Sequence, residues 1–387
     1  MDKTAQHLRI VYVTPALYMA GGVERVLTMK ANYFAEQYGY DIVIVLTEGK
    51  DKPLFYPLSD KVTVVNLNIG FEELWTLPFW KKILVYLRKQ RHFRRLLRKE
   101  LMRLRPDITV SLLRREINFI NDIPDGSRKI GELHINRANY RNFDAEGGGW
   151  LKRQFARLWS ARLTTHLKQL ERLVVLTEKD REAWTELDNV VAIADPLPFT
   201  PTAVSRQTER RVVAIARYSH EKGIDLLLKA WAEVQQKNED WRLDVFGDGD
   251  RTAYEQLAAD LGIDAGRCSL HGRTANVEQE YCRSSMMVLS SRFEGFGMVM
   301  IEAMACGLPV VAFDCPWGPR SIITDGEDGL LAENGNTAQL AEQMLRLMAD
   351  DERRQAMAAA AVRNVQRYSI ERIAAQWRDK VFCSQQR

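Results

Sequence analysis

The stretch SSRFEGFGMVMIEAMACGLPVVAFD, residues 290–314, decides the fold of this chain. A short β-rich run ends at Ser290 or Ser291, a glycine-rich turn leads into a helix, and Gly307 and Pro309 mark the end of that helix before a second β-rich run. A strand, a helix and a further strand form the repeating unit of a parallel α/β sheet. In such sheets ligands bind at the carboxyl ends of the strands, and the free N–H groups at a helix start suit an anion such as a diphosphate.

The same alternation extends over the whole chain. Strands are predicted at LRIVYVTP, DIVIVLTE, KVTVVNLN, DITVSLL, RKIGELH and RLVVLT, and then at RRVVAIAR, RLDVFG, RCSLHG, SMMVLSS and LPVVAFD. Between the two groups, Pro196, Pro198 and Pro201 make a stretch too stiff and too poor in donors for a helix or a central strand. We therefore predict two Rossmann-like, doubly wound α/β domains that face a cleft. They span residues 1–195 and 196–367, and residues 368–387 form an amphipathic helix that returns to the first domain.

Composition limits the class of protein. No apolar run approaches the ~18 residues needed to span a bilayer, and the start MDKTAQHLR lacks the apolar core of a signal peptide. Five cysteines, none in a C-x-x-C pair, fit reduced thiols. We therefore expect a cytoplasmic protein. Up to residue 195 there are 32 basic and 24 acidic residues, and 23 and 27 after it, so the halves carry +8 and −4. The first half is expected to face something anionic.

Two carboxylates flank the glycine turn. Glu294 lies in the turn, and Glu302 follows eight residues later, about one turn into the helix, so both can face the helix entrance. A carboxylate accepts hydrogen bonds from both hydroxyls of a vicinal diol, which a ribose or a hexose presents. The alternative is that Glu294 caps the helix and Glu302 is a solvated charge.

Two cations follow the first strand of the second domain, in VVAIARYSHEKGIDLLLKAW. Arg217 offers a planar fork to phosphate oxygens and Lys222 a mobile point charge, so together they can neutralise a leaving diphosphate without a metal ion. The alternative is a pair of surface charges, or a salt bridge between Lys222 and the neighbourhood of Glu221.

These segments together resemble family 4 of the retaining GT-B glycosyltransferases, and in particular the branch that serves bacterial capsule, exopolysaccharide and lipopolysaccharide biosynthesis. The resemblance is dense from residue 211 to about residue 331 and thinner before it, where it rests on PALYMAGGVERV and the GELH strand end. The pattern that carries it is Arg217-x4-Lys222-Gly223, FGDGD, Glu294-GFG-x4-Glu302-AMACGLPVVA, WGPRSII and DGEDGLL.

The resemblance implies roles in the second domain. Arg217 and Lys222 would hold the donor diphosphate, Glu302 the ribose and Glu294 the transferred sugar. The rest of the donor site would come from the turn and from the HGRTANV loop, which would line the base: Gly295, Phe296, Gly297, Met298 and Arg273.

It also implies two roles in the first domain. Gly22, at the first strand-to-helix turn, would close over the diphosphate, and His134 matches an active-site histidine that contacts the donor sugar. Many relatives have an acid directly after this histidine, whereas here Ile135 follows it.

The implied reaction moves a hexose or an N-acetylhexosamine from a nucleoside diphosphate sugar, for which we expect UDP, to a hydroxyl of a growing, lipid-linked surface glycan. No residue in the sequence is recognisable as a covalent nucleophile. As the resemblance implies, we therefore expect the acceptor to attack the anomeric carbon on its front face, assisted by the leaving phosphate, with retained anomeric configuration. We expect no cofactor, no metal ion and no nucleic-acid partner. Turn chemistry explains Asp248 and Asp250, which form a D-x-D in the GDGD sequence.

The sequence lacks the marks of two other classes of protein. A dinucleotide-dependent oxidoreductase needs G-x-G-x-x-G after the first strand, and PALYMAGGVERV lacks it. A non-catalytic membrane-surface adaptor on the same fold would have lost Arg217, Lys222, Glu294 and Glu302, which are all present.

A basic segment, residues 81–105, holds eleven Lys or Arg against one Glu. Apolar residues recur in and beside it at near-helical spacing: Trp80, Ile83, Leu84, Leu87, Leu97, Leu101 and Leu104. A second basic-aromatic helix is predicted over residues 150–172. Such helices can lie on anionic membranes, so we expect peripheral binding to the inner face of a membrane. The alternative is that the apolar stripes pack on the sheet and the charges are solvated.

Overall fold

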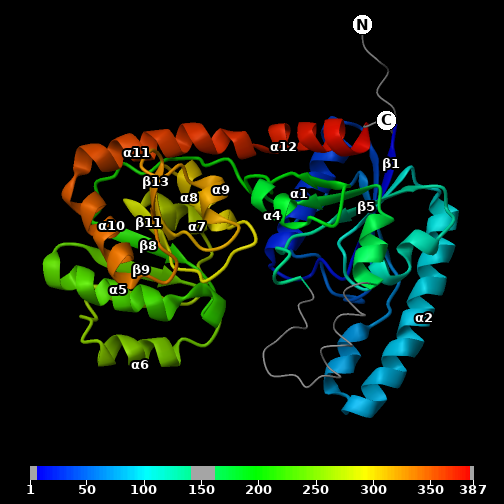
Figure 1. Ribbon diagram of the computed structural model, residues 1–387, viewed down its shortest axis with the longest axis horizontal. Helices are drawn as coiled ribbons and strands as arrows, with labels where there is room; N and C mark the ends of the chain where they lie inside the picture. Colours follow the sequence, from blue (N-terminus) through cyan, green and yellow to red (C-terminus); the bar gives the residue numbers. More distant parts are fainter. Residues whose placement is uncertain (1–6, 141–161, 384–387) are drawn as a thin grey trace, which may run out of the picture. The chain divides into compact units, whose positions relative to one another are not determined.

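The computed structural model describes residues 7–140 and 162–383. The chain forms two compact units, one made of Met1–Ala194 and Ile370–Arg387 and the other of Asp195–Ser369 (Figure 1). Each unit contains a parallel sheet with helices on both faces. This confirms the predicted fold class of two doubly wound α/β sheets.

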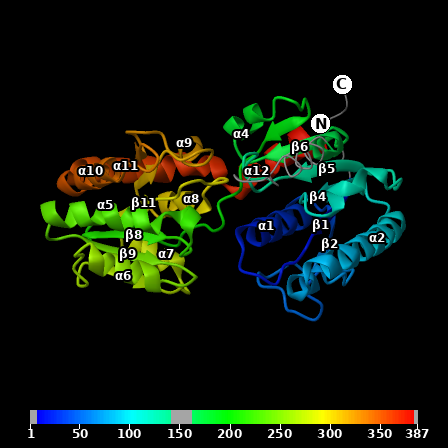
Figure 2. The ribbon, with the colours of Figure 1, turned by 60° about the horizontal axis from the view of Figure 1, so that its bottom comes forward.

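The first unit contains a seven-stranded parallel sheet within the described residues. Its strands, in sheet order, are β3 (Val62–Asn66), β2 (Asp41–Leu46), β1 (Arg9–Thr14), β4 (Ile108–Ser111), β5 (Arg128–Glu132), β6 (Arg172–Val175) and β7 (Val190–Ala192). Its helical elements are α1 (Gly22–Gln37), η1 (Phe71–Thr76), α2 (Phe79–Leu104), η2 (Glu116–Asn118), η3 (Ile120–Asp122), residues 162–168, α4 (Glu178–Ala183), α12 (Ile370–Trp377) and η6 (Arg378–Phe382). Figure 2 shows α1 and α2 on opposite sides of the strands.

The long helix α2 packs on this sheet with its second half only. Phe93, Leu97 and Leu101 recur every four residues, so they form one stripe, and they are buried against Val11 and Val13 of β1. In the first half the apolar residues Ile83, Leu84 and Leu87 are exposed. The alternative interpretation, in which the apolar stripe packs on the sheet, therefore holds for the second half of α2 but not for these turns. The second predicted basic helix lies largely outside the described residues.

The C-terminal helix returns to the first unit, as predicted. Helix α12 packs on α1, and the ring of Phe382 lies 5.2 Å from the ring of Phe34 (Figure 1). The Arg128 guanidinium, at the start of β5, donates hydrogen bonds to the carbonyl oxygens of Val381 and Phe382 at 2.6 and 2.5 Å. Apolar burial and these backbone contacts together hold the end of the chain against the first sheet.

The second unit contains a six-stranded parallel sheet. Its strands, in sheet order, are β10 (Cys268–His271), β9 (Arg242–Phe246), β8 (Arg211–Ile215), β11 (Met286–Leu289), β12 (Val310–Phe313) and β13 (Gly329–Ala332). Its helical elements are η4 (His220–Lys222), α5 (Ile224–Lys237), α6 (Thr252–Asp260), α7 (Val277–Cys282), α8 (Met298–Ala305), α9 (Pro319–Ile322), α10 (Thr337–Ala349), α11 (Asp351–Asn364) and η5 (Val365–Tyr368). Alternate strand residues such as Val212 and Val288 pack against α5 and α10.

Both sheets reverse their strand order beside the first strand. In the second unit β8 lies between β9 and β11, so the connections that leave β8 and β11 turn to opposite faces. Such a reversal opens a crevice at the carboxyl ends of the strands, where α/β proteins bind ligands. The two loops at this point are residues 216–223 and 290–297, which carry Arg217, Lys222 and Glu294. The sheet thus brings together a cation, Lys222, and a carboxylate, Glu294, that are more than 70 residues apart in the sequence.

Within the described ranges, no helix combines the length and the apolar character needed to cross a bilayer. All five cysteines are free, and Cys306 and Cys315 are buried.

Candidate functional site

The loop that follows β8 presents both predicted cations. The exposed Arg217 guanidinium donates to the Glu221 carboxylate at 3.0 Å, one helical turn along the loop. Burial would raise the pKa of the Glu221 carboxyl, but hydrogen bonds from its own backbone and from the Ser219 side chain, together with the charges of Arg217 and Lys222, hold this pKa below its usual range. Lys222 ends η4 and points elsewhere. The alternative of a salt bridge between Lys222 and the neighbourhood of Glu221 is therefore wrong, because Arg217 pairs with Glu221 and Lys222 pairs with Glu294.

The loop that follows β11 brings Glu294 to Lys222. The Lys222 ammonium lies 2.7 Å from Glu294 Oε1, and the buried Ser291 hydroxyl donates to the same oxygen at 2.6 Å. Glu294 itself is buried, and the N-cap residue of the following helix is Gly297. A cation and a carboxylate from two strands thus meet at the reversal point of the sheet.

Arg292 connects the loop that follows β11 to the loop that follows β8. Arg292 donates to both carboxylate oxygens of Asp225 at 2.9 and 2.7 Å and to the carbonyl oxygen of His220 at 2.7 Å. The Arg292 guanidinium holds the pKa of the Asp225 carboxyl below its usual range. Arg292 lies two residues before Glu294, and Asp225 lies three residues after Lys222. The bidentate contact between Arg292 and Asp225 therefore fixes the distance between the Lys222 and Glu294 side chains.

Gly223 closes the contact between these loops, and replacing it with alanine is expected to be costly. Its φ is +62°, and an added Cβ would lie 2.1 Å from the carbonyl oxygen of Ser290. Positive φ costs a non-glycine residue about 1–2 kcal/mol, and the backbone clash adds to it. We expect Gly223→Ala to lower the free energy of unfolding by more than about 2 kcal/mol in a urea titration.

Gly262→Ala is the matched control for this prediction. Gly262 has a φ of +65°, but no atom lies within 4 Å of an added Cβ. It therefore reports the dihedral strain alone. Equal losses in the two variants would show that the contact between the β8 and β11 loops contributes nothing.

Helix α8 starts at the glycine turn and buries Glu302. Gly297, with a φ of +98°, allows the chain to turn into the helix directly after Glu294. Glu302 is buried, and the Tyr281 hydroxyl donates to its Oε2 at 3.2 Å. The alternative that Glu302 is a solvated helix charge is therefore wrong. Glu302 is thus a buried carboxylate inside α8 that accepts a hydrogen bond from Tyr281.

The loop after β10 carries the predicted base-lining segment. Its Arg273 is more than half exposed and lies 4.0 Å from Asp248. Asp248 and Asp250 behave as turn residues, because their side chains accept hydrogen bonds from the backbone N–H groups of Gly249 and Thr252 at 3.0 Å each. The prediction that turn chemistry explains the D-x-D is confirmed.

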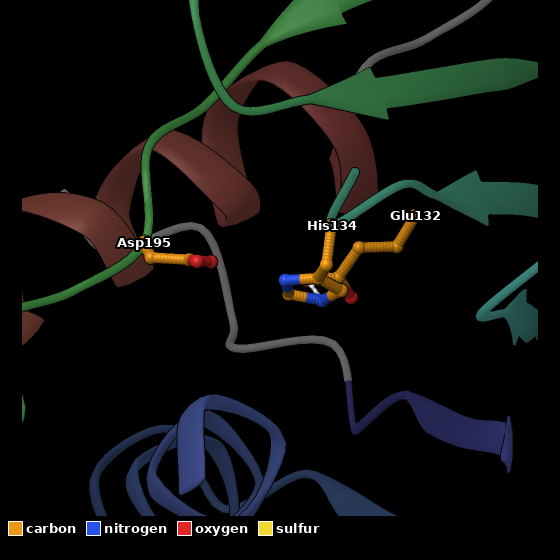
Figure 3. Close-up of side chains that lie close together, drawn as sticks. All are labelled: Glu132, His134 and Asp195. Carbon is orange, nitrogen blue, oxygen red and sulfur yellow. Dashed lines mark ion pairs between the residues drawn. The ribbon is translucent and has the colours of Figure 1, made fainter. Parts of the chain in front are cut away.

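In the first unit, His134 belongs to a buried ionic cluster. Its imidazole Nε2 lies 3.0 Å from Oε1 of Glu132, the last residue of β5 (Figure 3). The buried Lys30 ammonium, from α1, is paired with the same oxygen of Glu132 and lies 4.2 Å from the centre of the Trp377 ring of α12. Gly22 is the first residue of α1. Figure 3 also labels Asp195, with which the second unit begins.

The positive charges in this cluster determine whether the Glu132 carboxyl is ionised. Burial alone would raise the pKa of this carboxyl, but Lys30 and His134 more than offset it and lower the pKa to about 2. The carboxylate is therefore ionised at neutral pH and holds the His134 ring. Ile135 follows His134 in the sequence, and the acid that contacts the imidazole is Glu132, two residues before the histidine.

The sequence analysis missed seven residues of these clusters: Asp225, Arg292, Ser291, Tyr281, Lys30, Glu132 and Trp377. Ser291 stands inside the recognised motif, and its position three residues before Glu294 was a usable signal. Tyr281, Lys30 and Trp377 gave none, because each lies far along the chain from its partner.

Comparisons with known proteins agree with this geometry. The family model for group 1 glycosyl transferases matches residues 209–350, which include the β8 and β11 loops. An uncharacterized glycosyltransferase of Haemophilus influenzae is 29% identical over 366 residues, which are 93% of this chain and 96% of that one. The amylovoran biosynthesis glycosyltransferase AmsD of Erwinia amylovora is 30% identical over 54% of this chain and 61% of its own length.

Among solved structures, Anabaena HepE in complex with UDP and glucose superposes with a TM-score of 0.71 at 17% identity, over 98% of this chain and all of that one. At this identity the likeness speaks for the fold alone. The matched segment and the relative that is similar over nearly its full length agree: this chain is similar to the group 1 glycosyl transferases, family 4, over residues 209–350, and to a glycosyltransferase over 93% of its length.

Proposed function

We propose that this enzyme transfers a hexose or an N-acetylhexosamine from a UDP-sugar to a hydroxyl of a growing, lipid-linked surface glycan, with retained anomeric configuration. The observation that carries the proposal is the contact between Lys222 and Glu294, 2.7 Å apart at the reversal point of the second sheet. It places a cation suited to phosphate beside a carboxylate suited to sugar hydroxyls.

In the proposed chemistry, Lys222 and Glu294 separate when the donor binds, and each then contacts a different part of the donor. When the donor binds, its diphosphate takes the Lys222 ammonium from Glu294, and the freed carboxylate accepts hydrogen bonds from the hydroxyls of the transferred sugar. Arg217, on the same loop, adds a second cation for the leaving UDP. The acceptor hydroxyl then attacks the anomeric carbon on the face that UDP leaves, and the departing phosphate oxygen takes its proton.

Other groups are assigned by the family resemblance. We propose that Glu302 binds the ribose, and that backbone groups of Gly295, Phe296, Gly297 and Met298 bind the donor. We further propose that Arg273 lies in the loop beside the base. Gly22 and His134 of the first unit are proposed to contact the diphosphate and the sugar.

Support for the donor and the pathway comes from relatives. Anabaena HepE is in complex with UDP and glucose, and the Erwinia amylovora relative acts in amylovoran biosynthesis. We propose that this chain works at the cytoplasmic face of a membrane, where lipid-linked acceptors are exposed. The strand order of the first sheet also occurs in dinucleotide-binding proteins, so the topology alone does not separate a transferase from an oxidoreductase.

A donor screen in EDTA tests the proposal. The purified chain is incubated with UDP-glucose, UDP-galactose, UDP-N-acetylglucosamine, GDP-mannose or NADH together with a membrane extract, and released nucleotide and oxidised NADH are measured. We expect UDP release that depends on the extract, with an α-linked product by NMR. Turnover of NADH alone, or a product of inverted configuration, would contradict the proposal.

A further inference from the structure

The first turns of α2 expose apolar side chains that the fold does not use. Leu84 is 64% exposed and Ile83 and Leu87 are each 47% exposed, whereas Leu97 and Leu101 of the same helix are fully buried. The second half of α2 already anchors the helix to the sheet. These apolar residues therefore contribute little to folding, and large exposed apolar patches mark interaction sites.

Ile83 and Leu87 belong to one wall of a groove, and Leu84 lies beside it on the same helix. The other wall is η1, with Leu74 and with Trp75, which is 77% exposed. The hollow between η1 and α2 measures about 290 Å³ and is also lined by Lys82, Ile83, Tyr86, Leu87 and Arg115. We call it the η1–α2 groove. Its walls are apolar, and its two cations, Lys82 and Arg115, give it a positive edge.

A second, more polar hollow adjoins the groove at Tyr86. It measures about 160 Å³ and is lined by Tyr86, Gln90, Asn118, Arg162 and Leu163. An apolar hollow that shares a wall with a polar, cationic one fits a molecule with a hydrocarbon part and an anionic part.

The exposed face of α2 continues the positive charge away from the groove. Leu84, Leu87, Arg91 and Arg98 are spaced by three, four and seven residues, so they lie on one side of the helix. Ion pairs engage Lys89, Arg94 and Arg103, with Glu73, Asp122 and Glu100. Among the residues that the structure describes, Lys82, Arg88, Arg91 and Arg98 form no ion pair. The apolar residues Leu84 and Leu87 are therefore followed along α2 by cations that form no ion pair with a described residue. This arrangement complements a bilayer with anionic head groups.

We propose that the η1–α2 groove binds a hydrocarbon chain of an anionic membrane lipid, with Lys82 and Arg115 at the phosphate and the cationic face of α2 on the surrounding head groups. The proposal extends the proposed function, because it gives the membrane contact a defined site. It does not depend on donor chemistry, so it can fail while UDP binding holds.

The test uses the full chain and vesicles of phosphatidylglycerol or phosphatidylcholine. The chain contains nine tryptophans, and bromine atoms on acyl chains quench only those that lie close to them. We expect the wild type to sediment with phosphatidylglycerol vesicles at least tenfold more strongly than with phosphatidylcholine vesicles. We also expect brominated phosphatidylglycerol to quench part of the fluorescence, and Trp75→Phe to remove that part.

Variants locate the contact. Leu84→Gln combined with Leu87→Gln is expected to weaken vesicle binding at least tenfold, and Arg91→Gln combined with Arg98→Gln to remove the preference for the anionic lipid. Val204→Gln is the matched control, because Val204 is a similarly exposed apolar residue, 53% exposed, in the second unit. Unchanged UDP affinity shows that each variant is folded. The proposal would be overturned if the Trp75→Phe variant showed the same quenching as the wild type. It would also be overturned if the wild type bound equally to phosphatidylglycerol and phosphatidylcholine vesicles.

Discussion

Replacing Glu294 with glutamine is expected to lower kcat about 10²–10³-fold, the range seen when one charge-stabilising group leaves a transition state. The amide keeps the volume of the side chain and a partner for the Ser291 hydroxyl, but it loses the charge that orders the sugar hydroxyls. UDP affinity is expected to stay the same or to rise, because Lys222 no longer has to leave a carboxylate 2.7 Å away before it meets the phosphate. Initial rates with the best donor and calorimetric UDP titrations measure the two quantities.

Arg217→Ala gives the contrasting pattern. Its guanidinium is exposed and paired only with Glu221 on its own loop, so removing it should disturb the fold little. It should weaken UDP binding and turnover together, each about tenfold or more, because hydrogen bonds to charged groups contribute about 1.5–3 kcal/mol. If Glu294→Gln lost UDP affinity as strongly as Arg217→Ala, the division of roles between carboxylate and cation would be wrong.

Replacing Lys30 with methionine is expected to destabilise the first unit by about 3–5 kcal/mol, because it leaves the buried Glu132 carboxylate without its cation. Urea unfolding at pH 7.5 measures the loss. Lys52→Met is the control, since the exposed pair of Lys52 with Glu72 is 3.5 Å long and should contribute less than about 1 kcal/mol. Adding Glu132→Gln to Lys30→Met should recover part of the loss, because it removes the unpaired charge.

The same cluster predicts a pH dependence. Glu132 has a pKa of about 2 in the folded chain and an ordinary value of 4.5, so its contribution to stability is complete above pH 4.5 and is lost as the pH falls toward 2. Without Lys30, only His134 opposes the effect of burial, so the pKa of the Glu132 carboxyl rises and the folded variant takes up a proton at a higher pH than the wild type does. The stability gap between wild type and Lys30→Met should therefore narrow from pH 7.5 to pH 5. A gap that widens would contradict the assignment of Glu132 as the uncompensated charge.

The sequence predicted the parts of the site that depend on local pattern. Strands alternating with helices place the loops with Lys222 and Glu294 at the carboxyl edge of one sheet, whatever the details of packing. That these two side chains pair needs the strand order, in which β8 adjoins β11. Strand order depends on long-range packing, which periodicity does not encode.

Other contacts lay beyond sequence reasoning for the same reason. Lys30 and Glu132 are 102 residues apart, and the Tyr281 hydroxyl reaches Glu302 from the neighbouring helix α7. The helical pattern of residues 81–105 was correct, but its hydrophobic spacing is the same in the packed and the exposed half. Only the position of η1 and of the sheet edge shows that α2 extends past its own core contacts.

The most direct measurement is a calorimetric titration of the wild-type chain in EDTA with UDP, GDP, ADP and NAD. We expect UDP to bind with one site per chain and most tightly of the four, because the Arg217 and Lys222 cations supply the charge for the diphosphate. NAD binding alone, or UDP binding that appears only when a divalent cation is added, would contradict the claim that the reversal point of the second sheet is a nucleotide-sugar site.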